Sequence, residues 1–569
     1  MISAAAVAAA VGFAPAVAHA AAPAADRTPA TGAGSTQGPA AQNRAAEDAA
    51  AKLEAATAAA AKDAATFNSP AGRSVVKVLP GTGGPSAAAP HAAGAQAEPD
   101  FKVGLGTYGT GARTMRLATL VTTDRAGMIR IDVDWGDGRT ETEFVSSEDF
   151  GHFKHTYAEV GAHKITVTAT DPARNVSATN SVDVVVAGSE FTPHAPARLL
   201  DTRDGTGAAS AHPVGPYATT RVKIGGNGGI PAGVTSVALN ITATNATNDG
   251  HIAAYASGKE KPATSNVNFA AGQSVPNLAI VPVGEDGYVE LANGSAGSVD
   301  LIADVAGYFT RSVASGYTAL DPVRLVDTRY GQGTAKGQVA GQGTFGIQVA
   351  GQGGLPANGV KAVALNVTVT DPKQSGHLTV FPSGQQAPLA SNLNFTAGQT
   401  VANSVIVPVG QDGRISIRNG SWNPADVIVD VTGYYGADGK GAYLPVAPER
   451  LHDSRLYNWP LDGQDFRTQW LYQNDSKLVA AALNTTVTNT RGSGHLTVAP
   501  DPNTRDQYLA GKDVRPTRPN SSNLNWTKDT TVSNLVQANA GKDAVVDFWN
   551  GGWEPADLVI DLFGVYATD

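Results

Sequence analysis

A six-residue motif occurs three times along the C-terminal part of this chain. It reads Arg-Leu-Leu-Asp-Thr-Arg at residues 198–203, Arg-Leu-Val-Asp-Thr-Arg at 324–329 and Arg-Leu-His-Asp-Ser-Arg at 450–455. The copies therefore begin at residues 198, 324 and 450, which are 126 positions apart. Solenoid and propeller repeats have periods of roughly 20–50 residues, so each copy here is long enough to bury a core of its own.

Further segments keep the same register in every copy. The first copy contains Leu239-Asn240 within an alternating run, then Gly250-His251, and it closes on an apolar strand that holds Asp304. Many short β-branched runs separated by Gly, Pro, Asn and Asp predict an antiparallel β-sandwich or jelly roll for each repeat. We expect these three domains to occupy residues 191–311, 316–437 and 442–569.

The composition agrees with an all-β chain. The 569 residues include 64 Gly and 33 Pro but only 16% charged residues, which suits short strands and turns and excludes a helical bundle. A formal net charge of −9 offers no basic field for phosphates, so we expect no nucleic-acid partner. The absence of cysteine excludes disulfides, thiolate metal sites and thiol nucleophiles.

The first hundred residues have a different texture. Residues 1–20 form a short apolar run that ends in Ala-His-Ala, which predicts a secretory signal peptide whose basic start lies upstream of Met1. Residues 21–100 are rich in Ala, Pro and Gly, which predicts a disordered linker with a lone, partly frayed helix over 47–67. No stretch reaches about 18 consecutive apolar residues, so we expect no membrane span. The predicted location is extracellular, either secreted or loosely associated with a cell wall.

Half-buried strands are predicted from residue 101 onward, and three segments then follow in order. They are Val-Asp-Trp-Gly-Asp-Gly at 133–138, His-Thr-Tyr at 155–157, and a glycine-led strand from Gly161 to Asp171. Together they resemble the PKD domain, which implies an immunoglobulin-like β-sandwich over residues 101–188. We expect Trp135 to fill the space between the two sheets and the hydroxyl of Tyr157 to return to the backbone.

Carboxylates near the glycine turn of this module raise the question of a calcium site. Asp134 and Asp137 flank the turn, and Asp171 follows later in the sequence. Carboxylates close to a glycine turn suit hard cations, but carboxylates scattered along strands more often cap turns. We favour turn capping, and no cofactor is predicted.

Polar residues recur at matched positions in all three repeats, and two explanations compete for them. They could converge on a shallow site for a sugar or peptide that is used three times for avidity. Alternatively, they satisfy buried polar groups and close turns within the fold, which is the more common use of Asn and Asp in Gly-rich β proteins, and we favour this interpretation. In the first repeat these residues are Asp201, Arg203, Asn240, His251, Asn268, Asn277 and Asp304, and Asn403 and Asn534 correspond to Asn277.

Tryptophan is concentrated in the third repeat, and Trp422 and Trp553 are in register between the second and third repeats. Exposed indole faces stack on sugar rings, so these side chains predict a carbohydrate-binding surface. A terminal domain can also use tryptophan to cover an open end or to pack on its neighbour. The candidate binding residues are Trp549, Asn550, Trp553, Trp422 and Trp526.

No catalytic motif is present: the chain lacks a Gly-x-Ser-x-Gly elbow, a His-Glu-x-x-His helix and a Walker-type loop. The repeats resemble tandem repeats of secreted Gram-positive bacterial proteins with no activity known to us, which implies a location and no chemistry. The leading hypothesis is a secreted, non-enzymatic binding or adhesion protein whose partner is an extracellular glycan or another secreted protein. The alternatives are a structural scaffold, in which the three repeats pack on each other, and a hydrolase whose site is assembled in space.

Overall fold

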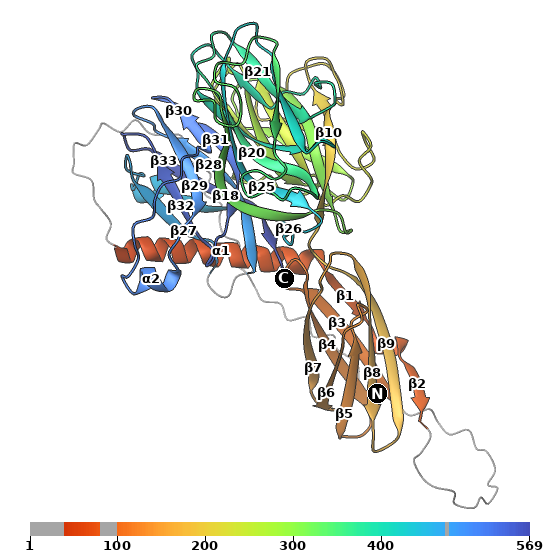
Figure 1. The fold of residues 1–569 in the computed structure, drawn as a ribbon. Helices are drawn as coiled ribbons and strands as arrows, with labels where there is room; N and C mark the ends of the chain where they lie inside the picture. Colours follow the sequence, from red (N-terminus) through yellow and green to blue (C-terminus); the bar gives the residue numbers. More distant parts are fainter. Residues whose placement is uncertain (1–38, 80–99, 473–476) are drawn as a thin grey trace, which may run out of the picture. The chain divides into compact units, whose positions relative to one another are not determined.

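The computed structural model describes residues 39–79, 100–472 and 477–569, and these belong to one compact unit. The unit is built almost entirely of antiparallel strands (Figure 1), so the all-β fold class predicted from the repeats is confirmed. The signal peptide predicted at 1–20 lies outside the described residues, as do the linker residues 21–38 and 80–99.

The N-terminal module is a sandwich of two sheets. Their strand orders are β1-β3-β4-β7 and β2-β9-β8-β5-β6. Trp135 is buried between them, and the hydroxyl of Tyr157 donates a hydrogen bond to the carbonyl oxygen of Trp135 at 3.1 Å, as expected from the sequence. The strands that follow the linker are β3 (Phe101–Gly109), β4 (Thr114–Thr123), β5 (Met128–Asp134), β6 (Thr140–Ser146), β7 (Phe150–Thr156), β8 (Ala162–Asp171) and β9 (Val176–Val185).

The expectation of a disordered linker is wrong for residues 39–79. They form α1 (Pro39–Ala64), β1 (Thr66–Ser69), the 3-10 turn η1 (Ala71–Arg73) and β2 (Val75–Val78). Strand β1 pairs with β3 and β2 pairs with β9, so each sheet of the sandwich gains an edge strand. The predicted helix exists, but it starts earlier and is docked rather than lone. Its face of alanines and Leu53 is buried, because small side chains let the helix approach its neighbours closely.

Each of the three C-terminal repeats contains eight strands in two four-stranded sheets. In the first repeat the orders are β10-β17-β12-β15 and β11-β16-β13-β14, and the other two repeats have the same order. This interleaving of first, last and middle strands is the jelly-roll arrangement, so the structure decides between the two predicted options. The first repeat contains β10 (Glu190–Asp201), β11 (Thr219–Lys223), β12 (Ser236–Thr244), β13 (Gly250–Ala256), β14 (Val267–Phe269), β15 (Val275–Pro282), β16 (Tyr288–Asn293) and β17 (Asp300–Thr310).

The remaining elements follow the same plan. The second repeat contains β18 (Gly316–Asp327), β19 (Thr344–Gln348), β20 (Val360–Thr370), β21 (Gly376–Pro382), β22 (Leu393–Phe395), β23 (Val401–Pro408), β24 (Arg414–Asn419) and β25 (Asp426–Gly436). The third contains β26 (Ala442–Asp453), η2 (Ser454–Tyr457), β27 (Phe466–Trp470), β28 (Leu478–Thr488), β29 (Gly494–Pro500), α2 (Arg505–Leu509), β30 (Leu524–Trp526), β31 (Val532–Asn539), β32 (Val545–Asn550) and β33 (Asp557–Ala567). Helix α2 lies in the insertion that distinguishes the third repeat.

The three jelly rolls pack against one another through a shared apolar core. The sheets that contain the first and last strand of each repeat supply its residues, and the other three sheets supply none. Aromatic side chains at matched positions form its centre, and their rings contact one another across the repeats. They are Phe191, Tyr317 and Tyr443 from the first strands and Phe309, Tyr435 and Tyr566 from the last strands. The repeats are therefore one packed body rather than separate beads.

Candidate functional site

Two asparagines of each repeat form a closed ring of hydrogen bonds between the repeats. The Nδ2 atom of Asn403 donates to Oδ1 of Asn240 at 2.9 Å, which joins the second repeat to the first. The equivalent bonds run from Asn277 to Asn484 and from Asn534 to Asn366, both at 3.0 Å. Each repeat therefore donates to one neighbour and accepts from the other, as in a closed cyclic assembly of three subunits.

Backbone groups complete this asparagine ring. The backbone N–H of Leu278 donates to Oδ1 of Asn403 at 3.3 Å, and Asn240 Nδ2 donates to the carbonyl oxygen of Ser391 at 2.6 Å. All six asparagines of the ring are buried. Buried amides need hydrogen-bond partners, and here the partners come from the neighbouring repeat as well as from the asparagine's own repeat. These residues hold the repeats together and present no free surface.

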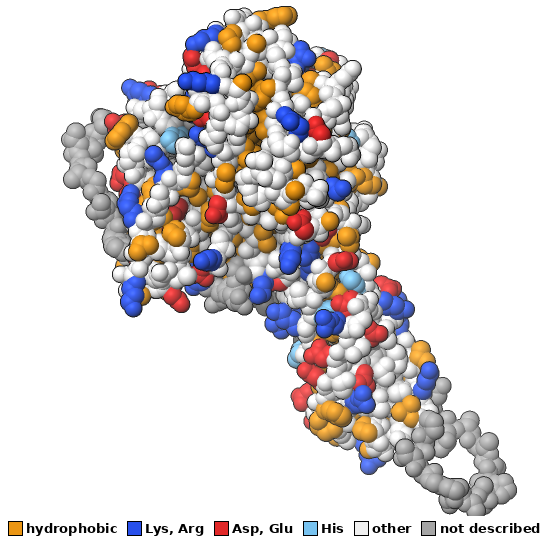
Figure 2. Space-filling model, in the orientation of Figure 1, with side chains coloured by type: hydrophobic (Ala, Val, Ile, Leu, Met, Phe, Trp, Pro, Cys, Tyr) orange, Lys and Arg blue, Asp and Glu red, His pale blue; other side chains and the backbone are white. Residues whose placement is uncertain are grey.

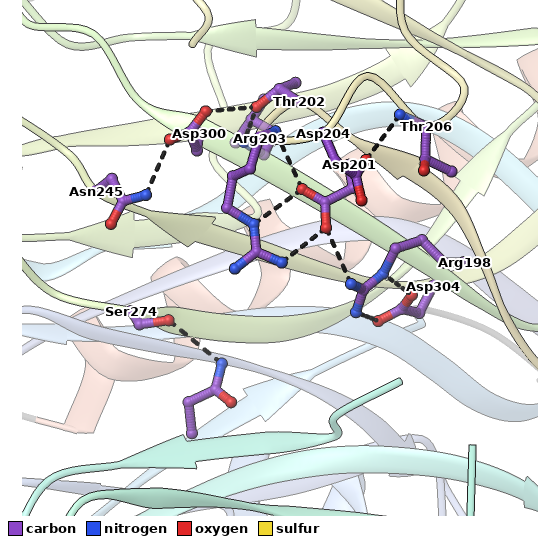
Figure 3. Close-up of polar contacts among 12 residues, drawn as sticks. Arg198, Asp201, Thr202, Arg203, Asp204, Thr206, Asn245, Ser274, Asp300 and Asp304 are labelled. Carbon is purple, nitrogen blue, oxygen red and sulfur yellow. Dashed lines mark hydrogen bonds and ion pairs between the residues drawn. The ribbon is translucent and has the colours of Figure 1, made fainter. Parts of the chain in front are cut away.

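The repeated Arg-Asp motif forms an ion-pair cluster between the first and last strand of each jelly roll (Figure 3). Arg198 Nε contacts Oδ1 of Asp304 at 2.9 Å and Arg198 Nη1 contacts Oδ2 of Asp201 at 2.9 Å. Arg203 holds Asp201 from the other side, with Nε–Oδ1 and Nη2–Oδ2 distances of 2.9 and 2.7 Å. The same cluster recurs around Arg324 and around Arg450. These carboxylates are used within the fold.

The pKa values of the two acids of this cluster are shifted in opposite directions. Hydrogen bonds from Arg203 hold the pKa of Asp201 below its ordinary value. Burial raises the pKa of Asp304, and the ion pair with Arg198 opposes that rise. A bidentate arginine partner compensates a buried carboxylate for the loss of water. The ion pair between Arg198 and Asp304 therefore stabilises the contact between β10 and β17.

The repeated histidines are packed rather than open. The ring of His251 lies so close to Gly294 that a side chain at position 294 would overlap it. Burial lowers the pKa of His251 and of His377, and it lowers the pKa of His495 to about 4. These imidazoles are therefore neutral at pH 7. Asn268 is half-buried and donates to the hydroxyl of Ser265 at 3.2 Å.

Three of the five candidate sugar-binding residues lie inside the third repeat, so the prediction is wrong for them. Trp526 and Trp549 are 5% exposed and Asn550 is 1% exposed. Trp549 stacks on Phe466, and the guanidinium of Arg515, which belongs to the insertion, lies over both rings. The amide of Asn550 donates to the carbonyl oxygens of Leu461 and Glu554. The inserted segment thus covers a sheet face that would otherwise be open.

The other two candidates, Trp422 and Trp553, are among the most exposed large side chains of the described residues, at 79% and 84%. Each lies in the loop before the last strand of its repeat. A glutamine from the neighbouring loop clasps that loop, since Gln342 Nε2 donates to Gly420 and Ser421, and Gln464 Nε2 donates to Gly551 and Gly552. The two indoles are therefore presented on fixed loops.

In the first repeat the exposed aromatic lies on the loop that carries the glutamine in the other two repeats. Tyr217 occupies the position of Gln342 and Gln464, shares their left-handed backbone with φ of 55°, and is 69% exposed. Its backbone N–H donates to Ser295, next to Ala296, which stands where the other repeats have tryptophan. Each repeat thus presents an exposed aromatic on this pair of loops. We call Tyr217, Trp422 and Trp553 the tip aromatics.

Sequence reasoning missed Tyr217 because it compared only aromatic residues at matching positions of the repeats. The signal was present, since Tyr217 lies two residues before a matched strand start, as Gln342 and Gln464 do. Tyr217 lies on one loop and the two tryptophans lie on the other, and these loops come together only in the folded repeat. Tyr217 therefore corresponds to Trp422 and Trp553 in space but not in sequence position.

The carboxylates considered for calcium cap turns in the N-terminal sandwich. Asp134 accepts a hydrogen bond from the backbone N–H of Gly136 at 2.9 Å. Asp137 accepts from Arg139 N at 3.0 Å and contacts His155 Nε2 at 2.8 Å. Among residues 39–79, 100–472 and 477–569, no group of three or more His, Cys, Asp or Glu is arranged to hold a metal ion. Asp134 and Asp137 are thus each used in a turn of the sandwich.

Sequence and fold together define a modular all-β protein: an immunoglobulin-like sandwich joined to three jelly rolls that pack as one body. Residues 103–184 match the family model described as PKD domain, which confirms the family suggested by the Trp135 and Tyr157 motifs. No curated protein matches the chain in sequence.

The solved structures that match this chain are very distant from it. A carbohydrate-binding module of the β-sandwich superfamily is 11% identical over 34% of this chain and 91% of its own, with a TM-score of 0.14. The structure of Sulfolobus turreted icosahedral virus is 8% identical over 68% of this chain and 92% of its own, with a TM-score of 0.15. At these values the likeness assigns no function to this chain.

Proposed function

We propose that this protein is a secreted, non-enzymatic binding protein that engages extracellular or cell-surface carbohydrate through the three tip aromatics. The observation that carries the proposal is that Tyr217, Trp422 and Trp553 are each exposed at one place in the jelly roll, supplied by two different loops. Large exposed aromatics mark interaction sites, and the faces of Tyr and Trp suit ligands that combine apolar and polar surface, as sugar rings do.

The packing of the repeats supports multivalent use of these aromatics. Because the asparagine ring and the aromatic core hold the three jelly rolls together, the three tips move as one body. A polymer that touches one tip meets the others at high effective concentration, which raises avidity by about 10²–10⁴ when the geometry allows. The scaffold role that the sequence also allowed is compatible with this arrangement, because the packed repeats would then hold the three tip aromatics in fixed positions.

The charged side chains on the visible surface are of mixed sign. On the face shown in Figure 2, Lys and Arg side chains are interspersed with Asp and Glu. Within the described part of the chain, no helix is long and apolar enough to cross a membrane. The non-enzymatic part of the proposal is supported by the histidines and paired carboxylates of the repeats, which are packed into the fold.

Removing the tip aromatics is expected to weaken retention on insoluble carbohydrate. Each of Tyr217→Ala, Trp422→Ala and Trp553→Ala should lower affinity about three- to tenfold, and the triple variant should lower it about a hundredfold or more. The measurement is a pull-down of the full chain on insoluble wall glycan and on chitin. Phe144→Ala is the control, because Phe144 is 61% exposed and lies on β6 of the N-terminal sandwich, outside the three repeats. Undiminished retention of the triple variant would refute the proposal.

A further inference from the structure

The third repeat carries a pocket of about 240 Å³ beside the loop of Trp553. Three loops at one end of this jelly roll form it: the segment after β26, the β28–β29 connection, and the loop that leads into β33. Its polar lining consists of Arg455, Asn458, Asn489, Arg491 and Asp557. Pockets for drug-sized ligands measure about 300–1,000 Å³, so this one admits a single small group rather than an oligosaccharide.

The groups of this pocket that remain free for a ligand are mainly hydrogen-bond donors. Arg455 uses Nε and Nη2 on the carboxylate of Asp453, at 2.8 and 2.6 Å, and its Nη1 has no partner among the described residues. In the same part of the chain, neither the guanidinium of Arg491 nor the amide of Asn458 has a hydrogen-bond partner. A guanidinium can only donate, and its fork matches the geometry of carboxylate and phosphate.

The one acid that lines the pocket is already engaged. Asp557 accepts the hydroxyl of Ser454 at Oδ1, at 2.5 Å, and the amide of Asn489 at Oδ2, at 2.8 Å. Both oxygens are thus held by protein donors, while Arg455 is balanced by Asp453. Arg491 is left without an ion-pair partner in the described residues. The pocket therefore offers an open cation and donors toward solvent.

The other two repeats lack this combination. The position of Arg491 is occupied by Thr247 in the first repeat, where the hydroxyl contacts the backbone of Ser298. In the second repeat it is occupied by Lys373, whose Nζ pairs with Asp371 at 2.7 Å. The third repeat has Asn489 in the place of that aspartate. Of the three residues at this position, only Arg491 is a cation without an acid partner in the described residues.

We propose that the pocket of the third repeat binds an oxyanion carried by a sugar, either the carboxylate of a uronic acid or a phosphate ester. The inference rests on the proposed carbohydrate function and names the class of saccharide that this one tip selects. In this arrangement the indole of Trp553 contacts the sugar polymer, while Arg491, Arg455 and Asn458 hold the anionic group. The tips of the first and second repeats are not expected to prefer charged saccharides over neutral ones.

Equilibrium binding of the full chain to three soluble polymers tests the inference. The probes are polygalacturonate, a glycerol phosphate polymer and a neutral galactan, and the variant is Arg491→Ala. Because hydrogen bonds to charged groups are strong, the variant should bind the preferred charged polymer about ten- to a hundredfold more weakly and the galactan unchanged. The charged polymer that loses more identifies the source of the oxyanion. Lys373→Ala is the matched control in the second repeat and should change neither.

Any of three outcomes overturns the inference. One is that the unmodified protein binds neither charged polymer more tightly than galactan. Another is that Arg491→Ala leaves both charged polymers bound as before, and the third is that Lys373→Ala weakens them equally. Failure of the wider proposal is distinguishable, because it requires that removal of all three tip aromatics leaves carbohydrate retention intact.

Discussion

Replacing Asn403 by aspartate is expected to destabilise the contact between the first and second repeats by about 3–5 kcal/mol. The buried Asn403 amide donates to Asn240 Oδ1 at 2.9 Å and to the carbonyl oxygen of Asn392 at 2.6 Å. Aspartate has the same shape but no N–H, so a carboxylate oxygen would face two acceptor oxygens in a site closed to water. The measurement is the unfolding midpoint by calorimetry, with small-angle scattering to detect opening of the three-repeat body.

Asn423→Asp is the matched control in the same repeat. Its side chain is exposed and donates one hydrogen bond to Gln374, so water can replace the lost partner and the midpoint should change little. Protonation of the new carboxyl at position 403 restores one donor, so the loss should shrink at low pH. Equal midpoints for the two variants would mean that the asparagine ring contributes nothing to holding the repeats together.

Stability of the third repeat is expected to fall as pH rises between about 4 and 9, because of one buried acid. Asp547 is 1% exposed in β32, and burial together with the negative charge of Asp501 raises its pKa from 3.8 to about 9. Between these values the folded state holds a proton that the unfolded state has released. Linkage then lowers the free energy of unfolding by about 1.4 kcal/mol per pH unit until Asp547 ionises in the folded state.

Asp547→Asn should remove this dependence, because the amide has the shape of the protonated acid and Thr468 can still donate to its oxygen. The stability gain over the unmodified protein should grow by about 1.4 kcal/mol for each pH unit above pH 5. Urea denaturation at pH 5 and pH 8 measures it, with Asp529→Asn, an exposed carboxylate, as control. An unchanged difference between the two pH values would show that Asp547 is not protonated in the folded protein.

The location of the Asp501 and Asp547 pair follows from the insertion in the third repeat. Tyr508 of α2 donates to Asp501 Oδ2 at 2.6 Å, and its ring packs with Trp470 and the alanines of α1. Nothing in the spacing of two aspartates 46 positions apart (501 and 547) predicts that they meet. Their proximity depends on which residues the β29–α2 segment and β32 bring to one face.

The helix α1 shows why docking escapes sequence reasoning. Its composition predicts a helix correctly, since helix propensity is local. Whether an alanine face is buried depends on the surface opposite it, and here β26 and β27 of the third repeat and β3 of the PKD sandwich supply that surface. Burial of Trp549 has the same origin, because Arg515 reaches it from a segment more than thirty positions away in sequence (515 and 549).

The amino-acid sequence by itself determined the all-β fold class, the threefold repetition and the PKD motif. These follow from alternating apolar residues, turn residues and a recurring register, which are patterns among residues close together in the sequence. Tertiary structure alone decided that the jelly rolls close into one body and that Tyr217 joins Trp422 and Trp553 as a third tip. It also decided that Arg491 has no ion-pair partner in the described chain while Lys373 has one. Those outcomes depend on which side chains from distant repeats or neighbouring loops meet in space, and packing of whole surfaces sets that.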